Sequence, residues 1–241
     1  YENATNQVGT ERFKAPSEEH IFGTDLYGRD QFARIIHGTR YTLLIGIGAV
    51  IIGISCGILF GSVAGYYGGK VDTVIMRIMD TVVCIPFILL ALTVVAALGP
   101  GLINLLIALM VAYIPSYTRV IRSAILSVVG QDYIEAAKSC GTPDRYIMLK
   151  HIIPNAFGVI IVQATMTFGK LIISASTMSF LGMGIQPPTP EWGSMLAEGK
   201  DYMLTSPHLV AFPGFAIVLT VLSLNLIGDG LRDALDPRLK D

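Results

Sequence analysis

Few side chains in this sequence have the types and the spacing that catalysis or metal binding requires. The four histidines lie far apart, at positions 20, 37, 151 and 208. A metal site needs several ligands at short, paired spacings, and nucleophilic catalysis needs a nucleophile beside a base. The sequence offers neither pattern. We therefore expect a protein that is not an enzyme and that binds no metal of its own.

One lysine is notable for its position. Lys170 is the only charged residue between Ile152 and Pro190. The pair Gly169-Lys170 lacks the upstream glycine of a phosphate-binding loop, so we expect no nucleotide site. Lys170 either lines a substrate path, or pairs with a neighbouring subunit or extends along its stem to the membrane surface. The other polar residues that we expect to line such a path are Gln163, Thr165, Ser174 and Asn225.

The distribution of charge indicates a membrane protein. Hydrophobic residues make up 52% of the 241 positions and charged residues 15%, with a mean hydropathy of +0.60. Soluble proteins carry about 25% charged residues. The apolar content excludes a disordered chain, and the net charge of −1 gives no general attraction to nucleic acid. Residues 41–69, 81–118 and 202–228 contain no Asp, Glu, Lys or Arg at all.

These uncharged runs are long enough for several membrane-spanning helices. A helix of roughly 20 apolar residues crosses the hydrocarbon core, and open strands are excluded there because their backbone groups would stay unpaired. Gly99-Pro100-Gly101 predicts a turn inside the longest run. The alternative, buried helices of a soluble core, accounts poorly for so many runs in one chain. We predict an all-α integral membrane protein with five spans, at about residues 42–66, 78–98, 102–122, 157–184 and 208–229.

Basic residues set the expected orientation, because short cytoplasmic loops are enriched in Lys and Arg. They cluster in residues 67–77, in 119–156 and in the C-terminal tail, which puts the N-terminus outside and the C-terminus in the cytoplasm. We expect three parts along the chain. These are an extracytoplasmic segment over 1–40 with a short interfacial helix at 30–39, a transmembrane domain over 41–230 with an external loop at 185–207, and a cytoplasmic tail over 231–241.

Small residues recur every fourth position in the first expected span. Ridges of this kind allow the backbones of membrane helices to approach closely. The ridge can serve static packing or a helix that slides against its partner, and the sequence leaves both open. Its glycines are Gly53, Gly57, Gly61 and Gly65.

The segment over 127–156 is too polar to span a membrane. Gln131 to Ser139 suits a short helix, and Gly141 suits the left-handed position that ends it. Thr142 is expected to cap a second helix that begins at Pro143, and Pro154 is expected to stop that helix before the next span. The result would be a helix–glycine–helix element displayed in the cytoplasm, a shape that suits a partner's groove.

The same segment carries a resemblance to a known family. Glu135-Ala136-Ala137, then Gly141, then His151-Ile152-Ile153-Pro154 resemble the EAA loop of ABC importer permeases. His151 and Ile153 depart from its usual ending. The chain is also similar to the second permease subunit of dipeptide, oligopeptide and nickel importers, in residues 22–30, 65–69, 179–182, 186–193 and 229–238. The residues to which this resemblance gives a role in ATPase coupling are Glu135, Ala136, Ala137, Gly141, Thr142, Pro143, Arg145, Tyr146, Lys150, His151 and Pro154.

The resemblance implies a type I ABC importer permease fold in the cytoplasmic membrane of a bacterium or archaeon. The family usually has six spans, so we expect that the first one is missing from this sequence. The implied partners are a homologous second permease, two ATPase subunits that hold ATP and Mg²⁺, and an extracytoplasmic substrate-binding protein. This chain itself would hold no cofactor. Glu191 and Trp192 of the external loop are expected either to contact the binding protein or to anchor the loop at the interface.

The expected function is transport of di- or oligopeptides by alternating access. Importers of nickel, of metal chelates or of other small solutes remain alternatives. The chain has Ala175 near a position where many relatives are acidic, and Lys170 is unusual among them, so the substrate does not follow from the resemblance. A secondary transporter would show inverted repeats, which the sequence lacks.

Overall fold

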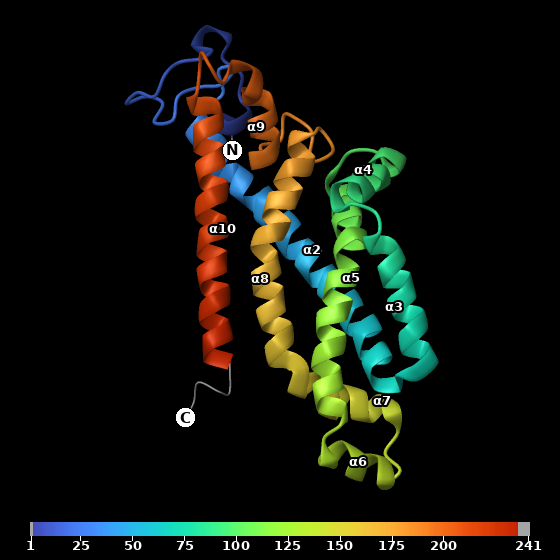
Figure 1. The fold of residues 1–241 in the computed structure, drawn as a ribbon. Helices are drawn as coiled ribbons and strands as arrows, with labels where there is room; N and C mark the ends of the chain where they lie inside the picture. The colour runs from blue at the N-terminus through green and yellow to red at the C-terminus, as the bar shows by residue number, and fades with distance from the viewer. Residues whose placement is uncertain (1, 236–241) are drawn as a thin grey trace. The chain divides into compact units, whose positions relative to one another are not determined.

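The computed structural model describes residues 2–235, and positions 1 and 236–241 lie outside the described residues. The regular secondary structure of the described part is helical, apart from one isolated bridge between Thr24 and Asp30, and loops connect the helices (Figure 1). Most of the expected tail over 231–241 therefore cannot be placed. The helices are α1 (Glu2–Thr5), η1 (Gly9–Glu11), α2 (Gln31–Tyr67), α3 (Gly69–Val83), α4 (Phe87–Leu98), α5 (Leu102–Val129), α6 (Asp132–Ser139), α7 (Asp144–Ile147), the π-helical η2 (Met148–Ile152), α8 (Ile153–Phe180), α9 (Trp192–Gly199), η3 (Lys200–Tyr202) and α10 (His208–Leu235).

Four helices of the described chain are long and apolar enough to cross a membrane. They are α2, α5, the continuous run Asp144–Phe180 and α10, and the bent pair of α3 and α4 makes a fifth if it counts as one span. This agrees with the all-α fold and the five predicted spans. The predicted turn at 99–101 is confirmed between α4 and α5, where Gly99 and Gly101 have φ values of +90° and +140°.

The second predicted span is not one straight helix. The chain bends by 86° between α3 and α4. Pro86 lies at the break, and it has no N–H to donate back along the helix, while its ring disfavours helical geometry at Ile85. The span predicted over 78–98 is therefore a bent pair of helices. The first helix of the pair, α3, begins at Gly69, nine residues ahead of the predicted start.

The interfacial helix expected over 30–39 is not a separate element. The chain enters α2 at Gln31 and continues without a break to Tyr67. A side-chain oxygen of Asp30 accepts a hydrogen bond from the backbone N–H of Ala33 at 2.8 Å. An acidic side chain at this place satisfies a free N–H and suits the positive end of the helix. The helix that contains the first span therefore begins eleven residues before residue 42, the predicted start of that span.

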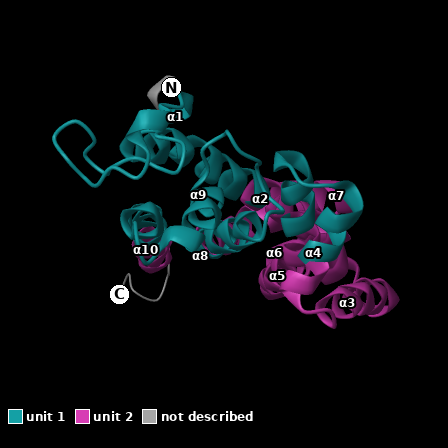
Figure 2. Cartoon of the chain, turned by 90° about the horizontal axis from the view of Figure 1, so that it is seen from above, with its two compact units in different colours: residues 1–49, 91–109, 168–224 teal, residues 50–90, 110–167, 225–241 magenta. Residues whose placement is uncertain are grey.

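The chain divides into two compact units, which Figure 2 shows in different colours. Unit 1 contains residues 1–49, 91–109 and 168–224. Its small core joins Ile35 of α2 to Trp192 and Met195 of α9, with Phe22 and Phe212 packed against them. The rings of Phe22 and Phe212 stack with their centroids 4.0 Å apart. The polar N-terminal segment is thus tied to α2, α9 and α10.

Unit 2 contains residues 50–90, 110–167 and 225–241. Its core is larger and joins the C-terminal half of α2, α5, the 127–156 segment and the start of α8. The buried members of this core are Tyr66, Tyr117, Ile121, Ala124, Ile125, Ile134, Ile147, Ile152, Ala156 and Ile160. In Figure 1, α6 and α7 lie at the end of α5.

Candidate functional site

The glycine ridge of α2 lies against α5 within unit 2. A Cβ atom placed on Gly57 would lie 2.6 Å from Cβ of Tyr117, and one on Gly61 would lie 2.9 Å from the carbonyl oxygen of Thr118. Both distances are too short for real atoms. The helices approach this closely only because the ridge has no side chains. The predicted glycines that meet α5 in this way are Gly53, Gly57, Gly61 and Gly65.

In the 127–156 segment, α6 ends in a tight reversal at Gly141. The residue has a φ of +72°, which confirms the predicted left-handed position. The N–H of Thr142 donates to the carbonyl of Ala137 at 3.1 Å, and the N–H of Gly141 donates to Lys138 at 2.9 Å. This pair of bonds is a Schellman motif. Any other residue at 141 would hold a strained backbone, although the structure leaves open space around it.

The second helix of the segment begins one residue later than predicted. Pro143, in extended conformation, precedes α7, and its carbonyl accepts hydrogen bonds from the N–H groups of Tyr146 and Ile147. Thr142 is therefore not the cap. Asp144 supplies the acidic residue of the first turn, which favours the helix through the local dipole.

Pro154 does not stop the helix, contrary to the prediction. The chain passes from α7 through the π-helical turn η2 and continues directly into α8. The N–H of Ile153 bonds to the carbonyl of Met148, five residues back. A proline in a regular helix collides with the carbonyl four residues before it, and the wider π turn ahead of Pro154 relieves that collision. The segment is thus continuous with a membrane helix.

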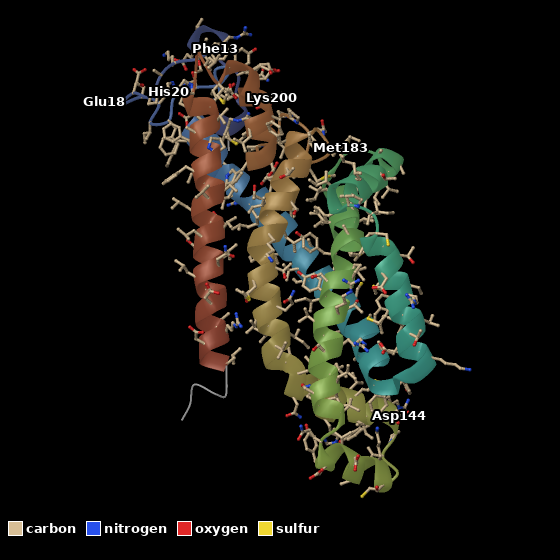
Figure 3. All side chains as sticks on the ribbon, viewed as in Figure 1. Phe13, Glu18, His20, Asp144, Met183 and Lys200 are labelled. Carbon is tan, nitrogen blue, oxygen red and sulfur yellow. The ribbon has the colours of Figure 1, made fainter. Side chains whose placement is uncertain are left out.

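The inner face of the segment is fixed to the membrane helices of unit 2. Ile134 of α6, Ile147 of α7 and Ile152 of η2 are fully buried in the unit 2 core. The hydroxyl of Tyr66, at the end of α2, donates to Asp144 at 2.7 Å (Asp144 is labelled in Figure 3). The ammonium of Lys138 lies 4.9 Å from the centre of the Tyr66 ring. The sequence analysis missed Tyr66, although the pattern of residues 65–69 was noted.

The outer face of the segment is exposed and chemically mixed. Tyr133, Tyr146 and Leu149 are 45%, 49% and 65% exposed. The predicted coupling residues with exposed side chains or backbone are Glu135, Ala136, Gly141, Pro143, Arg145, Tyr146, Lys150 and Pro154, while Ala137, Thr142 and His151 are half-buried.

Five polar residues follow one another along a single face of α8. They recur at alternating intervals of four and three residues. This spacing puts them within about 80° of one another around the helix axis and spreads them along about 21 Å of its length. We call this set the α8 polar stripe. It consists of Gln163, Thr167, Lys170, Ser174 and Thr177. The sequence analysis named three of them and missed Thr167 and Thr177, which the helical spacing could have shown.

Lys170 lies near the middle of α8 and of this stripe. Its side chain is exposed, and no carboxylate within the described residues forms an ion pair with it. Along the stripe, the amide of Gln163 donates to the hydroxyl of Thr167 at 3.1 Å. Thr165 lies on another face, where its methyl group approaches Gly228 of α10. Asn225 is exposed on α10 itself.

Glu191 and Trp192 are buried, although they were expected to be available to a binding protein. Glu191 is fully buried, and Trp192 is 3% exposed. The indole N–H of Trp192 donates to the carbonyl of Ile35 in α2 at 3.0 Å. Both side chains pack inside unit 1, so their surfaces are not free for a partner.

Glu191 caps α9 from its buried position. Its two oxygens accept hydrogen bonds from the backbone N–H groups of Gly193 and Ser194, and Thr42 of α2 donates to it at 3.3 Å. Burial raises the pKa of Glu191 above its ordinary value, and the hydrogen bonds from the two N–H groups oppose the rise.

Three buried charged residues, Asp25, Arg29 and Arg34, and the half-buried Glu198 hold the N-terminal segment to α2 and α9. Arg29 contacts Asp25 at 2.6 Å and Glu198 at 2.9 Å, and Arg34 contacts Glu198 at 2.7 Å and Asp25 at 3.4 Å. The two arginine side chains are 1% exposed. We call this the ion quartet. The sequence analysis noted Asp25 and Arg29 only as part of a family pattern, because nothing in a sequence pairs them with a residue so distant as Glu198.

These features can be compared with known proteins. The family of binding-protein-dependent transport system inner membrane components matches residues 57–241, which is most of the chain. The chain belongs to this family. It is an ABC importer permease subunit of the cytoplasmic membrane, and the resemblance inferred from the EAA loop is confirmed.

Close relatives of the permease come from several bacteria. The dipeptide transport permease DppC of Alkalihalophilus pseudofirmus is 47% identical, over 95% of this chain and 75% of the relative. The di/tripeptide permease DppC of Pseudomonas aeruginosa is 46% identical, over 92% and 73%. The glutathione permease GsiD of Pectobacterium atrosepticum is 47% identical, over 94% and 75%. All three are named as transport system permease proteins.

Solved structures support the same fold. The methionine ABC transporter MetNI in an inward-facing conformation superposes with a TM-score of 0.69 and 20% identity, over 85% of this chain and 97% of the other. An amino acid ABC transporter crystallised with histidines gives a TM-score of 0.66 and 17% identity, over 84% and 94%. At these identities the likeness concerns the fold alone.

Proposed function

We propose that this permease moves di- or oligopeptides into the cell by alternating access, driven by ATP that separate subunits hydrolyse. The substrate class rests on the relatives, whose names specify dipeptide, di/tripeptide and glutathione transport. The chemical requirement is a polar route through apolar helices, and Gln163, Lys170 and Ser174 of α8 would contribute to it. The N-terminal segment and residues 185–207 would face the outside.

The partners follow from the family. The permease would pair with a homologous second permease, so that the two chains enclose the path between them. Two ATPase subunits, which carry the ATP and Mg²⁺, would dock on the cytoplasmic side. A binding protein would deliver peptide outside, to exposed residues of the N-terminal segment and the external loop, because Glu191 and Trp192 are buried.

The observation that carries the proposal is the two-sided construction of the 127–156 segment. Its outer face presents Glu135, Arg145 and Tyr146, which suit a protein partner. Its inner face is locked to α2, α5 and α8 by buried isoleucines and by the bond from Tyr66 to Asp144. Packed interiors transmit displacement with little compression. A push on the segment would therefore move the helices of unit 2 as one body.

The test uses the complete transporter in proteoliposomes, with both permeases, the ATPases and the binding protein. Gly141→Glu puts a charged side chain on a backbone at φ +72°, and Glu135→Lys reverses a charge on the outer face. We expect each variant to reduce ATP-driven peptide uptake at least tenfold and to weaken retention of the ATPase subunits on the purified permease. Lys70→Gln, an exposed lysine of α3 outside the segment, is the matched control.

The experiment separates the two halves of the proposal. Uptake and ATPase binding that survive both substitutions would show that the segment is not the docking site. Uptake that needs no ATPase subunits at all would contradict the importer mechanism itself.

A further inference from the structure

We propose that Tyr66 is a positioning residue that fixes the two short helices of the 127–156 segment to each other, so that movement of docked ATPases reaches the membrane helices. This role rests on the proposed function and deepens it. The proposed function treats the segment as one body, and Tyr66 is the side chain that makes it one. The residue lies near the end of α2, outside the segment, and its side chain contacts both α6 and α7.

The joint between α6 and α7 is open. Nothing lies within 4 Å of a Cβ atom built on Gly141, where the chain reverses. Backbone hydrogen bonds close the reversal as far as Thr142, and Pro143, which follows, has no N–H to extend them. Each short helix has one buried side chain, Ile134 in α6 and Ile147 in α7. Apolar burial is non-directional, so a single anchor for each helix leaves the angle between them unspecified.

Tyr66 supplies directional contacts to both helices. Its hydroxyl donates to Oδ1 of Asp144 in α7 at 2.7 Å. The ammonium of Lys138 in α6 lies 4.9 Å from the centre of its ring, within the range of a cation–π contact. Lys138 and Asp144 stand three residues before and three residues after Gly141. One rigid side chain therefore joins the two sides of the reversal.

Tyr66 can pass on a displacement because it is itself held firmly. Its side chain is 8% exposed and belongs to the unit 2 core together with Ile134 and Ile147. The preceding residue, Gly65, lies on the glycine ridge, and a Cβ atom there would lie 2.8 Å from Ile125 of α5. Packed interiors transmit displacement with little compression. A tilt of α6 or α7 would therefore reach α2 through the ring of Tyr66, and α5 through the ridge.

The ring and the hydroxyl of Tyr66 have separable roles. The ring fills space in the unit 2 core, and phenylalanine would fill the same space. Only the hydroxyl donates to Asp144. If Tyr66 merely packs, Tyr66→Phe changes nothing. If it fixes the angle between the short helices, the substitution loosens that angle and leaves the outer face of the segment, where the ATPases would dock, as it was.

The experiment measures peptide uptake and ATP hydrolysis in the same proteoliposomes, with the complete transporter, and gives the peptide imported per ATP hydrolysed. We expect Tyr66→Phe to lower this ratio at least threefold, with the ATPase subunits still retained on the purified permease. A residue that only stabilises the fold would change the yield of the complex and not this ratio. Tyr67→Phe is the matched control, because it removes a hydroxyl from the next residue, whose side chain is 51% exposed.

A second pair of variants tests the same bond from its exposed side. Asp144 is exposed, so Asp144→Ala removes the acceptor without disturbing the core. It should lower the ratio as Tyr66→Phe does, while Asp144→Asn keeps a side-chain oxygen and should retain most of it. The double variant Tyr66→Phe with Asp144→Ala should be no worse than either single one, because both remove one interaction.

The other outcomes are distinct. A wild-type ratio in both Tyr66→Phe and Asp144→Ala would overturn the proposal, and so would losses that add in the double variant, because the two residues would then act separately. Loss of the ATPases from Tyr66→Phe would mean that Tyr66 shapes the docking face and does not transmit movement, which also overturns it. If the wild-type complex shows no ATP-dependent uptake of peptide, the proposed function fails, whatever the variants do.

Discussion

The two halves of α2 are held by different sets of contacts. The N-terminal half, in unit 1, is bound by polar groups: Arg34 joins the ion quartet, Ile35 accepts from the Trp192 indole, and Thr42 donates to Glu191. The C-terminal half, in unit 2, meets α5 through glycines that bring the two backbones together. Among the described residues, the ion pairs of α2 are therefore confined to the N-terminal half, which also meets Phe168 closely at Gly46, while the C-terminal half lies against α5 through a run of four glycines.

The solvent explains the difference. Between helices surrounded by lipid there is little hydrophobic driving force, so close van der Waals packing of small residues holds them together. Near an aqueous surface a polar loop has to be fixed to a helix, and hydrogen bonds with ion pairs can do this if every charge is matched. The quartet meets that condition, with two arginines and two carboxylates. The halves should therefore differ in which substitutions destabilise them.

The largest effect is expected at Arg34. Arg34→Ala leaves Glu198 with one arginine in place of two and opens a buried space, and breaking a buried ion pair typically costs about 3–5 kcal/mol. We expect a marked fall in the thermal stability of the purified complex in detergent. Arg40→Ala is the matched control, because Arg40 is an exposed arginine of the same helix, and it should change stability by less than about 0.5 kcal/mol. Equal effects of the two changes would show that the quartet does not hold the segment.

Substitutions in the glycine ridge are expected to lower the stability according to the size of the new side chain, and its charge should matter less. Gly57→Leu forces side-chain atoms into Tyr117 and its backbone, and overpacking of this kind costs about 1–3 kcal/mol. Gly158→Leu on α8 is the control, because nothing lies within 4 Å of a Cβ atom at that position. The measurement is the same thermal unfolding. If Gly57→Leu lowers the thermal stability no more than Gly158→Leu does, α2 and α5 are not in close contact.

The sequence predicts the two halves unequally well. The glycines recur at a fixed interval on one helix, so their common face follows from helical geometry alone. The ion quartet joins residues near 25–34 to Glu198, and no local rule pairs charges that far apart in the chain. The same limit applies to Glu191 and Trp192, because their types suit a surface loop and only the fold shows that they are buried.

Prolines mark a second limit of sequence reasoning. Pro86 and Pro154 have the same missing N–H, yet one ends a helix with a sharp bend and the other lies inside a continuous run. The difference lies in the π-helical turn before Pro154, which is flanked by Ile147 and ends at Ile152, both buried in the unit 2 core. The charge-free runs predict where membrane helices lie, and tertiary packing decides where they break.

The smallest effect is expected at Glu191, and it concerns pH. Burial raises the pKa of Glu191 in the folded protein above its unfolded value near 4.5. The folded state therefore holds this proton more tightly, and the group's contribution to stability is complete below that unfolded value and is lost as pH rises through the folded pKa. Over that window the slope is at most about 1.4 kcal/mol per pH unit. Glu191→Gln removes the titrating group and keeps an oxygen that can accept from Gly193.

The measurement is the thermal midpoint of the wild type and of Glu191→Gln between pH 4.5 and 7. The wild type should lose stability relative to the variant as pH rises, and the gap should then become constant. Glu18→Gln, at an exposed glutamate of the same unit, should run parallel to the wild type. Parallel curves for Glu191→Gln as well would mean that this carboxyl titrates alike in the folded and unfolded chains. Burial of Glu191 against the first half of α2 would then add no pH-dependent term to the free energy of unfolding.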